Sequence, residues 1–256
     1  MWGRFISWLK NIFSPAKPLP PPVNPPAPVQ PPAPAPEPLP NPGDDSMPIC
    51  GIDVSHDEDD IQWMLVAKDP QKIKFAFIKA TEGSDYQDPN FAKNWAGAKA
   101  AGIIRGAYHY FRPGMEPELQ AQNFLKTVGQ LQSGDMPFMI DFEVMDGVDS
   151  HTAIFRLLTF ANLISQASGL IPFLYSYPDF IDSQLLNDTR LAAYPLFISN
   201  VQVVEPKIPV PWHRCTAWQY SWTGSVNGIM SNSLDMDLFM GRVEDLKAIC
   251  KQGDKI

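Results

Sequence analysis

Cysteine and basic residues are both scarce in this chain of 256 residues. The three cysteines, Cys50, Cys215 and Cys250, lack metal-ligand spacing and cannot all pair with one another. They predict neither a metal site nor a disulfide framework, and they leave the redox compartment open. Lys and Arg number 20 against 28 Asp and Glu, and the resulting net charge of -8 argues against a nucleic-acid partner.

Proline is sparse in most of the chain and dense near its start. Of the 27 prolines, 16 lie in residues 15–48 and 11 in residues 49–256. Because proline fixes φ and removes a hydrogen-bond donor, residues 15–48 are predicted to be an extended polyproline II linker. Residues 49–256 have the apolar content of a globular protein and are predicted to form one folded domain.

The first 14 residues carry a different pattern. Residues 2–13 read WGRFISWLKNIF, with apolar side chains at helical spacing and Arg4 and Lys10 on the other side. This pattern predicts an amphipathic helix that contacts a membrane surface, or packs on a partner or on the folded domain. The segment is too short to span a bilayer, and no small-residue cleavage site follows it.

From Ile49 onward, short apolar runs alternate with amphipathic stretches. The alternation predicts an α/β fold with a parallel sheet, and eight strands in roughly 200 residues predict a TIM-like barrel. Little helix is expected between the last three strands, so the second half should be irregular. The expected strands lie at 49–55, 73–80, 103–111, 136–143, 171–177, 195–199, 216–221 and 234–239, with helices at 90–101, 117–129 and 150–168.

Acidic side chains fall at the ends of these expected strands. Asp53 ends the first strand, Asp141 and Glu143 end the fourth, and Asp235 lies near the start of the last. In such a barrel the chemistry sits at the carboxyl ends of the strands, and residues two apart share a face. Crowding and burial raise the pKa of at least one such carboxyl group. A neutral acid beside ionised ones is what glycoside hydrolysis requires.

Aromatic side chains accompany these acids. Each ring could be a core residue, but several together beside carboxyl groups favour a sugar ligand, because flat apolar rings stack on sugar faces. The aromatic residues at or near expected strand ends are Tyr108, Tyr110, Phe111, Tyr175, Tyr177, Trp218 and Tyr220.

Other interpretations of the polar residues are weaker. Asp141 and Glu143 could be structural acids paired with Lys79 or Arg105. His56 beside residues 57–60 could bind a metal, but consecutive loop residues cannot all converge on one ion, and an acidic first helical turn is favoured.

Two further polar residue types carry no predicted chemistry. His109 is expected on the opposite face of its strand, as a packed and hydrogen-bonded core residue. Ser55 and Ser176 lack a partnered histidine, so a nucleophilic serine is not predicted.

Six motifs resemble one enzyme family in their order and spacing. They are GIDVSH (51–56), FIKATEG (77–83), AGIIRGAYHYF (101–111), MIDFE (139–143), WQYS (218–221) and LDMDLF (234–239). Together they resemble the family-25 glycoside hydrolases, the lysozymes of phage-endolysin and bacterial-autolysin type, over about residues 49–242. The resemblance implies a (β/α)5(β)3 barrel that cleaves the β-1,4 bond between N-acetylmuramic acid and N-acetylglucosamine in peptidoglycan.

The resemblance also implies roles for individual residues. Glu143 would be the general acid, and Asp141 either the nucleophile or the group that orients the substrate's acetamido group. Asp53 and Asp235 would complete an acidic cluster. Whether the reaction retains or inverts the anomeric configuration stays open, because it depends on the carboxylate separation. The expected substrate contacts are Tyr108, Tyr110, Tyr175, Gln219 and Glu82.

The expected setting follows from the same reasoning. We expect a monomer with peptidoglycan as its partner and no cofactor or metal. It would act in the cell envelope or as a secreted or periplasmic protein, with a membrane contact through its N-terminal helix as one option. The other setting is a phage-encoded protein that is released to the wall at lysis. The alternative is a non-catalytic glycan-binding barrel displayed on the Pro-rich arm.

The chain departs from the family pattern at three places. Residues 57–60 (DEDD) stand where the family usually has Gln-Gly before a Trp. Asp237 stands where Asn is common, two residues after Asp235. Residues 196–201 (LFISNV) differ from the usual Trp-containing strand, so Asn200 is assigned no role.

Overall fold

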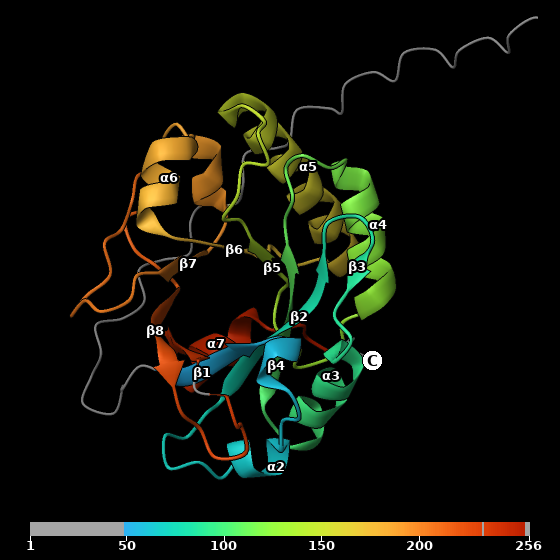
Figure 1. The fold of residues 1–256 in the computed structure, drawn as a ribbon, viewed down its shortest axis with the longest axis vertical. Coiled ribbons are helices and arrows are strands. Elements are labelled where there is room, and N and C mark those ends of the chain that lie inside the picture. The colour runs from blue at the N-terminus through green and yellow to red at the C-terminus, as the bar shows by residue number, and fades with distance from the viewer. Residues whose placement is uncertain (1–48, 232, 254–256) are drawn as a thin grey trace, which may run out of the picture. The chain divides into compact units, whose positions relative to one another are not determined.

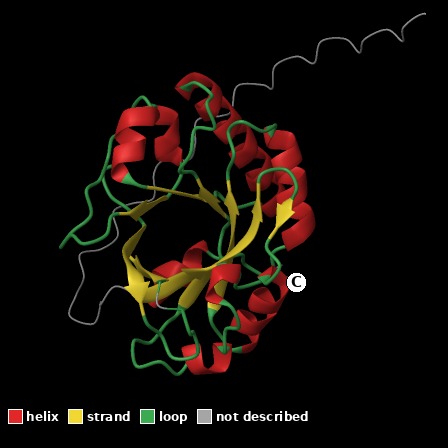
Figure 2. Ribbon diagram, viewed as in Figure 1, coloured by secondary structure: helices red, strands yellow, loops and turns green. Residues whose placement is uncertain are grey.

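Eight strands close into a barrel with helices on its outer side (Figure 2). The computed structural model describes residues 49–231 and 233–253, which lie within one compact unit. The segments 1–14 and 15–48 of the sequence prediction lie outside the described residues. Seven barrel strands are parallel, namely β1 (Ile49–Val54), β2 (Phe75–Glu82), β4 (Ile104–Tyr110), β5 (Met139–Asp141), β6 (Phe173–Ser176), β7 (Leu196–Ser199) and β8 (Ala217–Gly224).

The eighth strand, β9 (Leu234–Phe239), runs antiparallel between β8 and β1 and closes the ring. A short strand, β3 (Tyr86–Gln87), pairs antiparallel with β2 outside the barrel. Because β9 is reversed, its first residues lie at the same edge as the carboxyl ends of the parallel strands. The predicted parallel sheet is formed by the other seven barrel strands, and the antiparallel direction of β9 is a feature that the sequence pattern did not indicate.

A helix follows each of the first five barrel strands (Figure 1). None lies between β7 and β8 or between β8 and β9 in the described residues, so the predicted (β/α)5(β)3 arrangement is confirmed. No described helix is both long and apolar enough to cross a membrane. The helices are η1 (His56–Glu58), α2 (Trp63–Val66), α3 (Phe91–Ala100), α4 (Pro117–Val128), α5 (Ser150–Ser168), α6 (Pro178–Gln184), η2 (Thr189–Ala193) and α7 (Val243–Ile249).

Local signals explain where the long helix α5 begins and ends. The Asp149 side chain accepts a hydrogen bond from the Thr152 amide at 3.1 Å and caps the first turn. The helix ends at Gly169, whose φ of 74° is the left-handed conformation that glycine adopts without strain. A local signal also marks the start of α4, which has Pro117 in its first turn, where the missing N–H costs no hydrogen bond.

The barrel lumen is filled by aromatic and aliphatic side chains. Its buried cluster includes Phe75, Phe77, Phe173 and Phe197, all from odd-numbered strand positions. Two glycines make room for these rings, because a Cβ at Gly51 would lie 2.2 Å from Phe75 and one at Gly106 would lie 2.4 Å from Phe77. The alternate strand residues, such as Ile52, Ile78 and Ala107, pack outward against the helices.

The end of the lumen opposite the carboxyl ends of the strands is covered by α7. Leu246 and Cys250, in and just after this helix, belong to the same buried cluster as Phe75 and Phe239. The lumen is thus a packed core with one covered end, and the chemistry is confined to the mouth at the carboxyl ends of the parallel strands.

A buried ion pair ties β4 to the loop that precedes β5. Arg105 Nε and Nη2 donate to the two oxygens of Asp135 at 2.8 and 3.1 Å, and Arg105 Nη1 donates to the Trp95 carbonyl at 2.7 Å. The guanidinium also stacks over the Trp95 ring, 3.9 Å from its centre. Arg105 is therefore held away from the mouth and does not pair with Asp141 or Glu143.

We predict that Asp135→Asn strongly destabilises the protein, because it leaves the Arg105 charge buried without a counter-ion. The expected loss in the free energy of unfolding is about 3–5 kcal/mol. The control is Asp182→Asn, which removes the exposed partner of Lys207 and should cost only about 0–1 kcal/mol. Denaturant unfolding measures both, and equal losses would contradict the prediction.

Candidate active site

Four carboxyl groups from distant segments meet at the barrel mouth. Asp53 is near the end of β1, Asp141 ends β5, Glu143 follows two residues later, and Asp235 is near the start of β9. Asp53 and Asp235 are direct partners in the β1–β9 register. The reversed strand thus brings residue 235 beside residue 53, as the acidic cluster predicted from the sequence requires.

Two cavities open at this mouth, and Asp235 lines both. The first, of about 470 Å³, is lined also by Asp53, Asp141 and Glu58. The second, of about 530 Å³, is lined also by Glu143, Tyr175 and Gln219. A pair of adjoining cavities of this size can take neighbouring sugar rings of one chain.

Strand β5 is shorter than the sequence predicted, and Glu143 lies beyond it. The alternation nevertheless continues past Asp141, because Phe142 is fully buried on the helix side, in edge-on contact with Phe111 and Phe180. Asp141 and Glu143 therefore both reach the mouth, each lining a different cavity. This is compatible with the expectation that residues two apart share a face, and the division between two cavities is a detail that the sequence did not indicate.

The carboxyl groups raise one another's pKa. Burial, and then the charge of Glu143, hold the pKa of Asp141 well above its ordinary value. Burial, and then the charge of Asp235, do the same to the pKa of Asp53. Burial raises the pKa of Glu143, and burial with the charges of Glu58 and Glu143 raises the pKa of Asp235 to about 7. Some of these groups therefore hold a proton at neutral pH.

Lys79 is a cation whose charge lowers the pKa of carboxyl groups in this cluster. It lines the first cavity and lowers the pKa of both Asp141 and Glu143, opposing the effect of burial. Its ammonium lies 3.2 Å from a Glu82 oxygen and 5.1 Å from the centre of the Tyr110 ring. Sequence analysis placed Lys79 at a strand end but gave it only a structural ion-pairing role.

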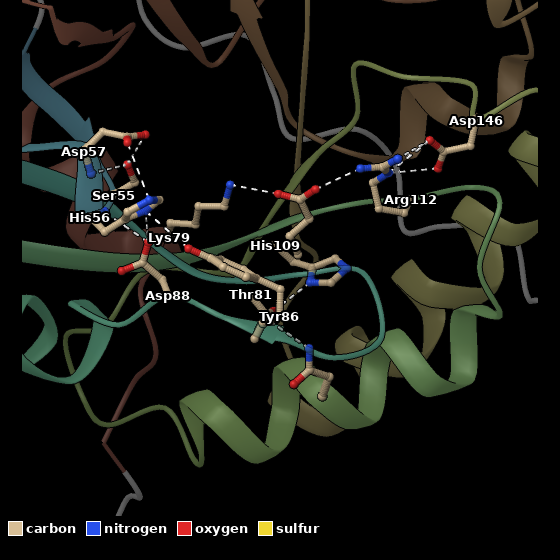
Figure 3. Close-up of polar contacts among 12 residues, drawn as sticks. Ser55, His56, Asp57, Lys79, Thr81, Tyr86, Asp88, His109, Arg112 and Asp146 are labelled. Carbon is tan, nitrogen blue, oxygen red and sulfur yellow. Dashed lines mark hydrogen bonds and ion pairs between the residues drawn. The ribbon is translucent and has the colours of Figure 1, made fainter.

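Glu82 joins two basic residues by ion pairs, because it accepts from both Lys79 and Arg112. Figure 3 shows Lys79, Arg112 and Asp146 in this series of contacts. Arg112 Nη1 donates to Glu82 at 2.9 Å, and Arg112 Nη2 donates to Asp146 at 2.6 Å. Glu82 lines neither of the two cavities. Its role as a substrate contact stays a prediction, and what the structure shows is an anchor for Lys79.

Gln219 holds Asp53 in place. Its Nε2 donates to Asp53 Oδ2 at 3.0 Å, while its Oε1 accepts from the Tyr175 hydroxyl at 2.9 Å and from Ser199 Oγ at 2.6 Å. Gln219 lines the second cavity, so its predicted contact with substrate is compatible with its position. Its side chain is nonetheless largely committed to neighbouring protein groups.

Glu58 is a buried member of the site that sequence analysis missed. The Ser55 amide donates to Glu58 Oε2 at 2.7 Å, and Ser55 Oγ accepts from the Asp57 amide at 3.1 Å. The Ser-x-x-Glu spacing of this capping box was the available signal. The expected solvated first turn is therefore wrong for Glu58, which lines the first cavity and whose pKa is raised by burial.

Two histidines, His109 and His56, contact polar side chains of the fold and line neither cavity. His109 is fully buried, within 2.7 Å of Thr81 Oγ1 and 3.0 Å of Gln120 Oε1, and burial lowers its pKa to about 4, as expected of a core residue. His56 Nδ1 lies 3.0 Å from Asp88 Oδ2. Across residues 49–231 and 233–253, no group of three or more His, Cys, Asp or Glu side chains is arranged to hold a metal ion.

Aromatic side chains line both cavities. Tyr108 and Tyr110 face the first, and Tyr175 and Tyr177 face the second, as expected for rings that stack on sugars. Trp222, half exposed in β8, also lines the second cavity and was not predicted. The remaining aromatic candidates, Phe111, Trp218 and Tyr220, line neither cavity, and Phe111 is a core residue.

Comparison with known proteins places this site in a family. Residues 52–229 match the model of the glycosyl hydrolases family 25. The chain belongs to glycoside hydrolase family 25. It is 34% identical to the uncharacterised protein YegX of Escherichia coli over 79% of this chain and 74% of that one. It is 30% identical to Lysozyme M1 of Streptomyces globisporus over 80% of this chain and 72% of that one.

Comparison of the fold with solved structures also indicates a family-25 lysozyme. The bacterial lysozyme of Streptomyces coelicolor superposes with a TM-score of 0.76 and 30% identity, covering 80% of this chain and 98% of that structure. The predictions of a family-25 barrel and of a glycosidase with muramidase activity on peptidoglycan are confirmed. The family-25 assignment does not by itself fix the role of each carboxyl group.

We predict that Lys79→Met moves the pH–rate profile of this family-25 enzyme toward higher pH. Lys79 lowers the pKa of Asp141 and of Glu143, so its removal raises both, and the acidic and basic limbs both shift upward. The control is Lys207→Met, because Lys207 also lines a cavity but pairs with Asp182. Turbidity loss of cell walls across pH measures the limbs. Unmoved limbs in Lys79→Met, or an equal shift in the control, would contradict the prediction.

Proposed function

We propose that Glu143 is the general acid of the muramidase reaction and that Asp141 is its partner. The observation that supports this most is the gathering of Asp53, Asp141, Glu143 and Asp235 around two sugar-sized cavities, with the pKa of each raised. Of the two neighbouring groups, Glu143 is the more exposed, so its carboxyl group is the one a glycosidic oxygen can reach. Asp141 is only 8% exposed.

The reaction then follows from the proton positions. Glu143 protonates the oxygen between the two sugars as the bond from that oxygen to C1 breaks. Positive charge develops on the ring, and an anionic carboxylate or the substrate's own acetamide oxygen stabilises it. Water adds to C1 and loses a proton, which returns Glu143 to its acid form.

Asp141 has one of two roles in this scheme. Its Oδ1 is buried and has no hydrogen-bond partner among the described residues, so this oxygen can still accept a hydrogen bond. It acts either as the nucleophile or as the acceptor that orients the acetamido group. Either role requires the ionised form, which the charge of Lys79 favours.

The other proposals concern the setting. The enzyme acts on the cell wall, and it reaches the wall by secretion or by release at lysis. Residues 2–13 contact a membrane surface and hold the barrel near the wall through the Pro-rich segment. The support for this contact is the amphipathic pattern of the sequence, with Trp2, Phe5 and Leu9 on one side and Arg4 and Lys10 on the other.

We predict that Glu143→Gln lowers the rate of cell-wall clearing by at least about 100-fold, because general acid catalysis contributes roughly 10²–10⁴-fold. The amide has nearly the same shape, so the melting temperature should stay close to that of the wild type. The matched control is Glu116→Gln, an exposed glutamate paired with Arg156 on the outer surface. Wild-type clearing by purified Glu143→Gln would refute the assignment.

Analysis of the released fragments completes that experiment. A muramidase leaves N-acetylmuramic acid at the new reducing ends, whereas a non-catalytic glycan-binding barrel releases none. Reducing ends on N-acetylglucosamine would mean that a different bond is cut.

We predict that the full chain binds anionic phosphatidylglycerol vesicles several times better than neutral phosphatidylcholine vesicles, because residues 2–13 combine an apolar side with two cations. Co-sedimentation measures the bound fraction. The matched control is Phe5→Gln in the full chain, which interrupts the apolar side without changing the charge and should lower the bound fraction. Equal binding by both proteins would remove this proposal.

A further inference from the structure

A carboxyl group below the mouth has no donor and no role in the scheme above. Asp237 is fully buried, and both of its oxygens lack a hydrogen-bond donor among the described residues. Its register partners are Gly51 on β1, which has no side chain, and Gln219 on β8. The Gln219 amide is engaged with Asp53, Tyr175 and Ser199. An ionised carboxylate in this position would have nothing to replace its hydration.

The groups that face Asp237 make its ionised form still less favourable. They are Asp53 on β1, Asp235 on the same strand and Tyr220 on β8, and none of them is a cation. Burial, and then the charges of Asp53 and Asp235, hold the pKa of Asp237 well above its ordinary value. The geometry alone demands the same state, because a neutral acid loses far less on burial than an anion does.

A neutral carboxyl group carries one O–H, and a buried O–H needs an acceptor. Asp53 is the acceptor that the strand register brings beside Asp237, because it pairs with Asp235, two residues before Asp237, and because Gln219, the register partner of Asp237, donates to it. Asp53 already accepts from Gln219 Nε2 at its Oδ2, so a second bond from Asp237 would give the Asp53 carboxylate two donors. Two such bonds stabilise the ionised form of Asp53 against burial and against the neighbouring charges.

We infer that Asp237 is a neutral carboxylic acid that donates a hydrogen bond to Asp53 and so favours the ionised form of Asp53. Asp237 is a positioning residue that acts through Asp53. The charge it maintains is one of those that raise the pKa of Asp141, so the buried acid helps to set the proton affinity at the reacting centre. The consequence for activity depends on the proposed roles of the mouth carboxyl groups, while the protonation state of Asp237 does not.

Two substitutions of similar volume, made in the full chain, test whether position 237 must donate a hydrogen bond or must be able to ionise. Asp237→Asn keeps an N–H donor and cannot ionise, whereas Asp237→Leu keeps the volume and removes the donor. We expect the Asn variant to clear cell walls within about threefold of the wild-type rate and the Leu variant to lose at least about tenfold, which is the effect of one buried hydrogen bond to a charged group. Equal activities of the two variants would overturn the donor role.

Thermal stability against pH tests the protonation state without using activity. Because the folded pKa of Asp237 is raised, the folded protein binds more protons than the unfolded chain above pH ~4, and this term lowers wild-type stability as pH rises. The Asn variant lacks the term. Its melting temperature minus that of the wild type should therefore increase by at least about 3 °C between pH 4 and pH 7.

The stability result stands whether or not Asp237→Leu folds and whether or not Glu143 is the acid. A difference that stays flat, or an Asn variant less stable than the wild type at pH 7, would mean that Asp237 is ionised in the fold and would overturn the inference. A carbon-13 titration of the aspartate carboxyl groups gives the same answer directly, because the signal lost in Asp237→Asn should show no deprotonation between pH 4 and pH 7.

Discussion

Burial of several carboxyl groups on a floor of aromatic rings governs this site. Phe75, Phe77, Phe173 and Phe197 fill the lumen beneath the mouth, and α7 covers the far end. The floor supplies no donors and excludes water, so the acids above it can be stabilised only by a few polar neighbours or by holding protons. Burial is accordingly the largest cause of the raised pKa at Asp53, Asp141, Glu143 and Asp235 alike.

Reversal of the last strand makes the cluster possible. In a fully parallel barrel the start of β9 would lie at the covered end, far from Asp53. Because β9 runs antiparallel between β8 and β1, Asp235 enters at the mouth and Asp237 lies one layer below, toward the aromatic floor. The same reversal removes the need for a crossover helix between β8 and β9, so the irregular end of the barrel and the acidic cluster have one cause.

The order of the strands and the positions of the four carboxyl residues could be predicted from the sequence, but the contacts of these residues could not. Short apolar runs located all eight barrel strands, and the polar strand ends located Asp53, Asp141, Glu143 and Asp235, since both signals are local. The reversal of β9 was missed because strand direction depends on closure of the whole ring. Lys79 was undervalued because its effect depends on Glu82, which holds its ammonium from within the same strand, while Arg112, just beyond the end of β4, holds Glu82. Glu58 had a readable capping signal, but only the fold reveals that it faces the cavity.

Substrate binding changes the burial of the two neighbouring carboxyl groups unequally. Without substrate, burial raises the pKa of both Asp141 and Glu143, and Asp141 is the more deeply buried of the two. A saccharide in the second cavity would cover Glu143 and remove its remaining water, which raises its pKa further. The two carboxyl groups repel each other's charge, so a proton gained by Glu143 makes it easier for Asp141 to ionise. Lys79 attracts both anions and stabilises the one that remains. On the proposed roles, binding of the sugar chain thus favours the proton on Glu143, the group proposed to act on the glycosidic oxygen.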